Sequence, residues 1–167
     1  MLRSAIDTTA RLYRNVVAPA VMRHGMQFAA LPFRIDGDGS VQILLVTSRE
    51  TRRWVLPKGW PIKHLRPSRV AEREAYEEAG LIGRVVGEQA IGSYGYDKRL
   101  PNSTQRCQVW VFALRVEHQI DDWPENPQRE TKWFGTEDAA NLVEERDLRS
   151  IIRGFPLMAQ CQVDQGL

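Results

Sequence analysis

The sequence is poor in the residues that usually build metal clusters and disulfide frameworks. Only two of its 167 residues are cysteine, Cys107 and Cys161, and only three are histidine. The cysteines form no C-x-x-C pair and the histidines are scattered, so a zinc site, a disulfide framework or a histidine cluster is not expected. No apolar run approaches the roughly 20 residues that a membrane-spanning helix needs. These absences favour a soluble protein of a reducing compartment without a membrane partner.

The chain also lacks a strong excess of charge of either sign. Its formal net charge is +2 and its pI is about 8.7. This balance suits an anionic ligand but is too weak to indicate a nucleic-acid-binding protein. With 43% hydrophobic and 26% charged residues, the composition is that of one ordinary globular domain. Nothing in the sequence specifies an oligomeric state.

The first 25 residues differ from the rest because they are rich in arginine and poor in acids. They contain four arginines and one acid, Asp7. We interpret residues 1–25 as an N-terminal extension. It is expected to contain a helix that ends near Pro19. An organelle transit segment is the alternative, because such segments are Arg-rich and acid-poor. The expected location is cytoplasmic under the first interpretation.

Apolar runs and turn signals predict strands that alternate with helices over residues 26–160. The turn from Asp36 to Gly39 joins two apolar runs and predicts a hairpin. The predicted strands are 26–35, 41–47, 54–59, 84–96, 105–116 and 131–134, and the predicted helices are 67–79, one from 136 and one from 145 into the 150s. The near-continuous apolar run at 41–47 indicates a strand that is buried on both faces. The pattern predicts one domain with an α/β/α sandwich around a mixed β-sheet.

The helix at 67–79 carries the most informative residues. Glu74, Glu77 and Glu78 stand at i, i+3 and i+4, so they project from one helix face. A neighbouring stripe of small residues, four apart, consists of Ala71, Ala75 and Ala79. Small side chains let the helix lie close to a sheet, which would hold the three carboxylates at the edge of a cleft. Because like charges at this spacing oppose helix formation, a divalent cation would relieve them, and Mg²⁺ prefers such oxygens.

The residues around these acids carry a family resemblance. The stretch from 59 to 81 resembles the Nudix box, G-x5-E-x7-R-E-U-x-E-E-x-G-U, in which U is a bulky aliphatic residue. The matching positions are Gly59, Arg73, Glu74, Glu77, Glu78 and Gly80. The chain departs from the box at two places, where Leu65 replaces the first glutamate and Ala75 replaces an aliphatic residue. By this resemblance, the chain is identified as a member of the Nudix hydrolase family.

The resemblance implies a metal-dependent hydrolase of phosphoanhydride bonds that acts on a small phosphorylated substrate. It assigns Glu74 and Glu78, with the Gly59 carbonyl, to Mg²⁺ or Mn²⁺. Glu77 would accept the proton of the attacking water. Arg73, four residues before Glu77, would fix a carboxylate rotamer.

Two later acids, Glu125 and Glu130, are alternatives to Glu77 as the proton acceptor, because the base is not placed uniformly across the family. The alternative without a function is that both are ordinary exposed charges of a loop. Because Leu65 stands where the box has its first glutamate, the alternative to an enzyme is a Nudix-fold binding protein without turnover.

Basic residues precede the acidic helix and suggest a heavily phosphorylated ligand. The predicted substrate-binding residues are Arg49, Arg52, Arg53, Lys58, Lys63 and Lys132. Arginine forks suit phosphate well, whereas lysine acts as a point charge. The alternative is an ordinary solvated basic loop.

The segments 54–59 and 132–134 look similar to the family branch that hydrolyses diphosphoinositol polyphosphates and diadenosine polyphosphates. We favour that branch, with ADP-ribose and other nucleotide derivatives as alternatives. Trp54 and Trp133 could stack on a base, although buried strand tryptophans are the commoner case.

Overall fold

A computed structural model describes the backbone of residues 25–164 and the side chains of residues 25–160. In chain order the elements are β1 (Gly25–Ile35), β2 (Val41–Thr47), β3 (Trp54–Val55), β4 (Lys58–Gly59), α3 (Pro67–Ala79), β5 (Leu81–Val85), β6 (Gly92–Leu100), β7 (Ser103–Gln119), η2 (Asn126–Gln128), β8 (Thr131–Gly135), α4 (Thr136–Leu142) and α5 (Arg146–Asp164). The predicted extension at 1–25 lies almost wholly outside the described residues, so its boundary stays a prediction. None of the described helices is long and apolar enough to cross a membrane.

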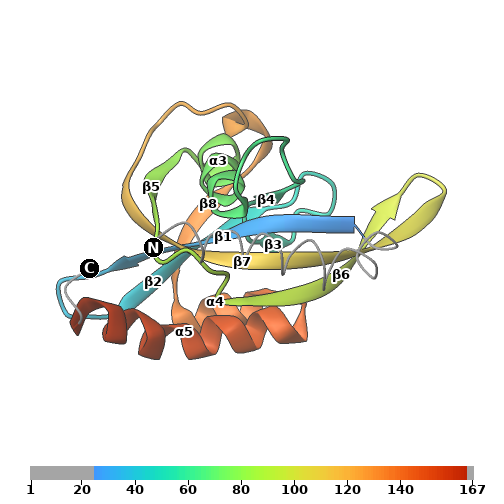
Figure 1. Cartoon of the computed structure of the whole chain (residues 1–167). Coiled ribbons are helices and arrows are strands. Elements are labelled where there is room, and N and C mark those ends of the chain that lie inside the picture. The colour runs from blue at the N-terminus through green and yellow to red at the C-terminus, as the bar shows by residue number, and fades with distance from the viewer. Residues whose placement is uncertain (1–24, 165–167) are drawn as a thin grey trace.

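The strands form a mixed sheet. Its central path runs β3-β2-β1-β7-β5, while β4 pairs with β1, β6 with β7 and β8 with β2. The pair β1–β7 is parallel and the other pairs are antiparallel. Helix α3 lies on one face of the sheet, and α4 and α5 lie on the other (Figure 1). The predicted α/β/α sandwich with a mixed sheet is therefore confirmed.

The central strands are buried on both faces, which explains their near-continuous apolar sequences. In β2, Ile43 and Leu45 belong to the core under α4 and α5, whereas Leu44 and Val46 belong to the core under α3. Successive side chains of a strand point to opposite faces, so one strand supplies both cores. The prediction of a two-sided strand at this position is correct.

The stripe of small residues on α3 allows the close approach that its spacing predicts. Ala71, Ala75 and Ala79 are fully buried against the sheet. The helix ends at Gly80, which has a φ of 66° and caps the last turn in the left-handed conformation. This arrangement fixes the height and rotation of α3, and hence the positions of its glutamates.

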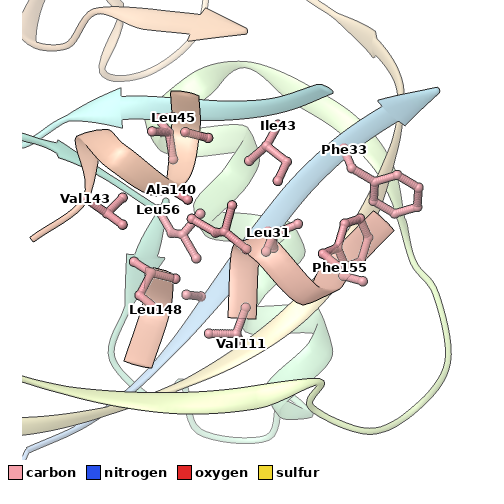
Figure 2. Packing of buried hydrophobic residues seen from close by; sticks show 14 of the residues in the cluster. Leu31, Phe33, Ile43, Leu45, Leu56, Val111, Ala140, Val143, Leu148 and Phe155 are labelled. Carbon is pink, nitrogen blue, oxygen red and sulfur yellow. The ribbon is translucent and has the colours of Figure 1, made fainter. Parts of the chain in front are cut away.

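The opposite core is built by an apolar stripe on α5. Leu148, Ile152 and Phe155 point into it at helical spacing, and the ring of Phe155 meets that of Phe33 edge to face, with centroids 4.9 Å apart. Figure 2 shows Leu148 and Phe155 in this core together with Leu31 of β1. This core anchors the start of α5 beside the cleft described next.

Two predicted strands are wrong in their extent. The stretch 54–59 is divided into β3, which pairs with β2, and β4, which pairs with β1. The stretch 84–96 does not form a single strand but is divided between β5 and β6 by a turn that contains Gly87 at a φ of 75°. Strand β6 then pairs with β7 as far as Leu100, opposite Ser103. The result is a long hairpin that projects at one end of the molecule (Figure 1).

Candidate functional site

A cleft of about 1040 Å³ opens beside α3. It is bounded by α3, β4 and the segment after it, the loop 48–53, the β6–β7 hairpin, the loop before β8 and the segment that leads into α5. Of the predicted site residues, the cleft brings together Gly59, Glu74, Glu78, Arg49, Arg53 and Lys58. Acidic side chains from α3 therefore face basic side chains from the loops around them.

Gly59 and Glu74 fit together so closely that only glycine is compatible with this packing. A Cβ atom at Gly59 would lie 2.0 Å from Oε1 of Glu74 and 2.6 Å from its Oε2. The carboxylate thus lies against the backbone of β4. Burial, followed by the charges of Glu77 and Glu125, raises the pKa of Glu74 to about 7.

Glu78 is the most deeply buried carboxylate of the described chain, with a relative exposure of 6%. Its Oε1 accepts a hydrogen bond from Arg129 at 2.7 Å. Its Oε2 is buried and has no hydrogen-bond partner among the described residues. Burial raises the pKa of Glu78 to about 7, although Lys58 and Arg129 oppose the shift. An unsatisfied buried carboxylate oxygen is costly unless a cation uses it.

Arg129 is the main site residue that the sequence does not reveal. Its side chain is 8% exposed and forms ion pairs with two acids. Its Nη2 lies 2.7 Å from Oε1 of Glu78, and its Nε lies 2.5 Å from Oε2 of Glu125. Its Nη1 donates to the carbonyl oxygen of Thr47 at 3.0 Å. Only the i,i+4 spacing from Glu125 was visible in the sequence, because Glu78 lies 51 residues away along the chain.

The loop before β8 is fastened to backbone carbonyls at the end of α3 by three hydrogen bonds. The N–H of Ile120 donates to the Gly80 carbonyl at 2.9 Å, and the N–H of Glu125 donates to the Glu77 carbonyl at 3.1 Å. The indole N–H of Trp123 donates to the carbonyl of Glu78 at 3.2 Å. These bonds satisfy carbonyls that a helix end leaves without partners, and they bring Glu125 to the cleft.

Glu77 and Arg73 lie outside the cleft lining. Their side chains pair on the helix surface, with Nε of Arg73 2.6 Å from Oε1 of Glu77. The pairing raises the pKa of Arg73. Arg73 is thus paired with one of the three carboxylates, and its role in fixing a rotamer stays a prediction; the cleft gathers two glutamates of α3 rather than three. Consistently, no three His, Cys, Asp or Glu side chains of the described residues form a ready-made ion site.

The predicted basic residues divide into those in the cleft and those outside it. Arg53 lines the cleft but is paired with Glu144 at 2.6 Å and Glu145 at 3.0 Å, so its charge is already matched. Arg49 is more available, with Gln128 at 3.3 Å and Glu125 at 3.9 Å. Loop residues far from each other in sequence therefore decide which arginine is free to meet a ligand.

Arg52, Lys63 and Lys132 do not line the cleft. Arg52 is paired with Glu130 at 2.5 Å. Glu130, the second alternative proton acceptor, does not line the cleft either. Lys63 is exposed on the surface, and the ammonium of Lys132 lies 5.3 Å from the ring centre of Phe134. The structure thus does not unite the whole predicted basic set.

The far end of the cleft carries aromatic rings with lysines beside them. The ammonium of the half-buried Lys58 lies 5.4 Å from the ring centre of Tyr96, and that of Lys98 lies 4.8 Å from the ring of Trp60. Burial lowers the pKa of Lys58, and the charge of Glu78 opposes this shift. Trp60 was missed in the sequence because no periodic pattern distinguishes it from other tryptophans.

Trp54 and Trp133, the two tryptophans that were considered for stacking on a base, pack against other residues of the fold. Trp54 packs edge to face on Phe134 with centroids 5.1 Å apart. The guanidinium of Arg34 lies 4.4 Å from the ring centre of Trp133. Neither tryptophan lines the cleft. Both tryptophans lie in strands, as expected, but they are half-buried rather than buried.

Together, fold and cleft define a class of protein: an α/β/α sandwich in which an acidic helix faces a basic-rimmed cleft. A family model described as NUDIX domain matches residues 25–155. The chain therefore belongs to the Nudix family, as its box residues predict.

Several known proteins are similar to this chain. Nudix hydrolase 12, mitochondrial, of Arabidopsis thaliana is 32% identical over 114 residues, which are 65% of this chain and 55% of the relative. Diphosphoinositol polyphosphate phosphohydrolase 3-alpha of Mus musculus is 30% identical over 118 residues, or 70% of this chain and 67% of the relative. The chain spans 55% to 66% of the lengths of three Arabidopsis Nudix hydrolases.

A solved structure supports the fold. The Ap4A hydrolase of C. elegans aligns with a TM-score of 0.57 at 19% identity, covering 81% of this chain and 98% of that one. At this identity the likeness concerns the fold alone.

Proposed function

We propose that the chain is a pyrophosphohydrolase that splits a phosphoanhydride bond with the help of Mg²⁺ or Mn²⁺ held by Glu74 and Glu78. The observation that carries the proposal is the buried Oε2 of Glu78, which has no hydrogen-bond partner among the described residues. It lies in the same cleft as the Glu74 carboxylate. Two carboxylates whose pKa burial raises to about 7 form a site that is short of positive charge.

The donor set fits a hard divalent cation. Carboxylate oxygens of Glu74 and Glu78 and the carbonyl of Gly59 are the oxygen ligands that Mg²⁺ prefers, with water and phosphate oxygens completing its shell. When bound, the ion supplies charge neutralisation and an acidified water. The chain's own task is to hold these oxygens on α3 and β4, and the exclusion of a side chain at Gly59 does this for Glu74.

The proton of the attacking water needs an acceptor, and we assign this role to Glu77. Glu77 is one helical turn from Glu74, and Arg73 holds its carboxylate at 2.6 Å. Glu125 is the competing acceptor because it lines the cleft, although Arg129 binds its carboxylate. In each carboxylate the arginine binds one oxygen and leaves the other to accept the proton, so substitution decides between them.

The substrate we favour is a diphosphoinositol polyphosphate or a dinucleoside polyphosphate. Arg49 and Lys58 line the cleft beside the acids, and Lys98 and Arg99 extend the positive charge along the hairpin. Several phosphate groups in a row would match this spread of cations. The name of the mouse relative, a diphosphoinositol polyphosphate phosphohydrolase, points to the first of these substrate classes.

A Nudix-fold binding protein with weak or no turnover is the second candidate. Two observations favour it: Glu77 lies outside the cleft, and Leu65, at the position of the first box glutamate, is 40% exposed and also outside it. A hydrolase of ADP-ribose or a related nucleoside diphosphate derivative is the third. The expected cytoplasmic location stays a prediction, since the arginine-rich segment lies outside the described residues.

A release screen tests the proposal. Purified protein is incubated with diphosphoinositol phosphates, diadenosine polyphosphates, ADP-ribose and nucleoside triphosphates, with Mg²⁺, with Mn²⁺ or with chelator, and products are separated by ion exchange. We expect metal-dependent release that Glu78→Gln abolishes and that the exposed turn variant Glu88→Gln leaves intact. Binding of these ligands without release would establish the second candidate instead, and a preference for ADP-ribose would establish the third.

A further inference from the structure

We propose that Arg129 is a built-in cation that limits the acidic part of the cleft to a single divalent ion. The inference rests on the proposed metal site and adds a role for a residue outside the Nudix box. Its basis is a contact rather than a motif: the guanidinium bridges Glu78 of α3 and Glu125 of the loop that follows β7.

Arg129 binds carboxylate oxygens that could otherwise serve as ligands of a second divalent ion. Its Nη2 lies 2.7 Å from Oε1 of Glu78, and its Nε lies 2.5 Å from Oε2 of Glu125. The side chain is 8% exposed, so water screens these pairs poorly. Glu78 is left with one free oxygen, Oε2. One acid therefore serves two cations, the arginine through one oxygen and the divalent ion through the other.

The third contact holds the guanidinium in place. Nη1 donates to the carbonyl of Thr47 at the end of β2, and the Thr47 hydroxyl accepts the N–H of Glu130 at 2.9 Å. Arg129 is thereby tied to the sheet as well as to both acids. A planar guanidinium fixed on three sides is far less free to leave than a hydrated ion, so it acts as a permanent charge of the site.

A count of the charges gives the same answer. Four carboxylates influence one another here, those of Glu74, Glu77, Glu78 and Glu125, and the cations that act on them are Lys58, Arg73 and Arg129. With all four acids ionised, one net negative charge remains. One divalent ion more than neutralises it, so a second would be repelled until substrate phosphates arrive. Without Arg129, two net negative charges would remain, which one divalent ion only neutralises, so a second ion would meet less repulsion and could use the carboxylate oxygens that Arg129 now occupies.

Manganese binding by the full chain without substrate tests this role. The free Mn²⁺ signal in electron paramagnetic resonance, followed during titration, gives the number of bound ions and their affinity. We expect one ion for the wild type. For Arg129→Met we expect a second ion or an affinity for the first that is higher by about tenfold or more, because a unit charge nearby has been removed. Arg129→Lys keeps the charge and should stay at one ion, as should Glu88→Gln.

A purely structural role predicts the opposite pattern. If Arg129 only fastened the loop to the sheet, Arg129→Met would weaken Mn²⁺ binding or leave it unchanged, and either result overturns the inference. Two tightly bound ions in the wild type overturn it as well, without need of any variant. This last result, with metal-dependent turnover, would leave the proposed function standing, whereas a wild type that binds no Mn²⁺ and releases no product would remove both.

Discussion

At the residue scale, Gly59 shows how a single atom decides the geometry of the site. A methyl group there would occupy the position of the Glu74 carboxylate, 2.0 Å from Oε1. We expect Gly59→Ala to displace Glu74 and to lower kcat/KM by roughly 100-fold, the scale of loss from an ångström misplacement of a catalytic group. Gly37→Ala is the matched control, since nothing lies within 4 Å of its added Cβ. Equal activity of the two variants would show that Glu74 is not a ligand.

The proton acceptor is also decided at this scale. Glu77→Gln and Glu125→Gln each remove one candidate carboxylate while keeping its shape. We expect Glu77→Gln to lower kcat by about 100-fold or more with little change in KM, as loss of a general base does. Glu125→Gln should cost much less. Steady-state kinetics at saturating metal measure both, and a reversed order would transfer the role to Glu125.

The residues differ in how far the sequence could foretell them. Glu74, Glu78 and Gly59 were predicted because their roles follow from a local pattern of 23 residues, and the structure brings all three to the cleft. Arg129 could not be predicted, because its pairing with Glu78 spans 51 residues and depends on how a loop crosses the end of α3. Arg53 was predicted to bind substrate, but it is paired with Glu144, 91 residues further along the chain, and with Glu145.

At the element scale, α3 is the most predictable part of the chain. Its bounds, its buried alanine stripe and its glycine end all follow from local sequence. By contrast, the boundary between β5 and β6 was missed, although Gly87 and Glu88, which strands seldom favour, stand at the break. Local patterns specify helices well, whereas the point at which a strand leaves one partner depends on the sheet.

The packing of α3 gives a stability prediction. Ala75 is fully buried and lies against the sheet, so Ala75→Leu would force apart α3 and its neighbours. We expect the free energy of unfolding to fall by about 1–3 kcal/mol, the usual cost of overpacking a core. Tyr76→Leu, on the exposed side of the same turn, should change it by no more than about 0.5 kcal/mol. Urea unfolding of both variants measures the difference, and equal midpoints would contradict this packing.

At the scale of the whole molecule, the site couples metal binding to stability and to pH. The fold buries Glu74 and Glu78 against the sheet and raises the pKa of each from 4.5 to about 7. The charged groups that act on them come from β4 and from the loop before β8 as well as from α3. They are Glu77 and Arg73 of α3, Lys58 of β4, Glu125 and Arg129. A change of ionisation at Glu74 or Glu78 therefore changes their electrostatic interactions with charged groups of the segments that line the cleft.

The sign of the pH dependence follows from these values. Between pH 4.5 and about 7 the folded state binds more protons at these two groups than the unfolded state, so their contribution to stability falls as pH rises through that window. A divalent ion binds the deprotonated carboxylates and stabilises the folded state by mass action. We therefore expect millimolar Mg²⁺ to raise Tm more at a pH of about 8 than at about 5.5, where protons compete for the same oxygens. Thermal melts with and without Mg²⁺ at both pH values measure this, and Glu74→Gln combined with Glu78→Gln should abolish the difference. An equal rise in Tm at both pH values would mean that the ion stabilises the chain at some other place, and Glu74 and Glu78 would lose their assignment.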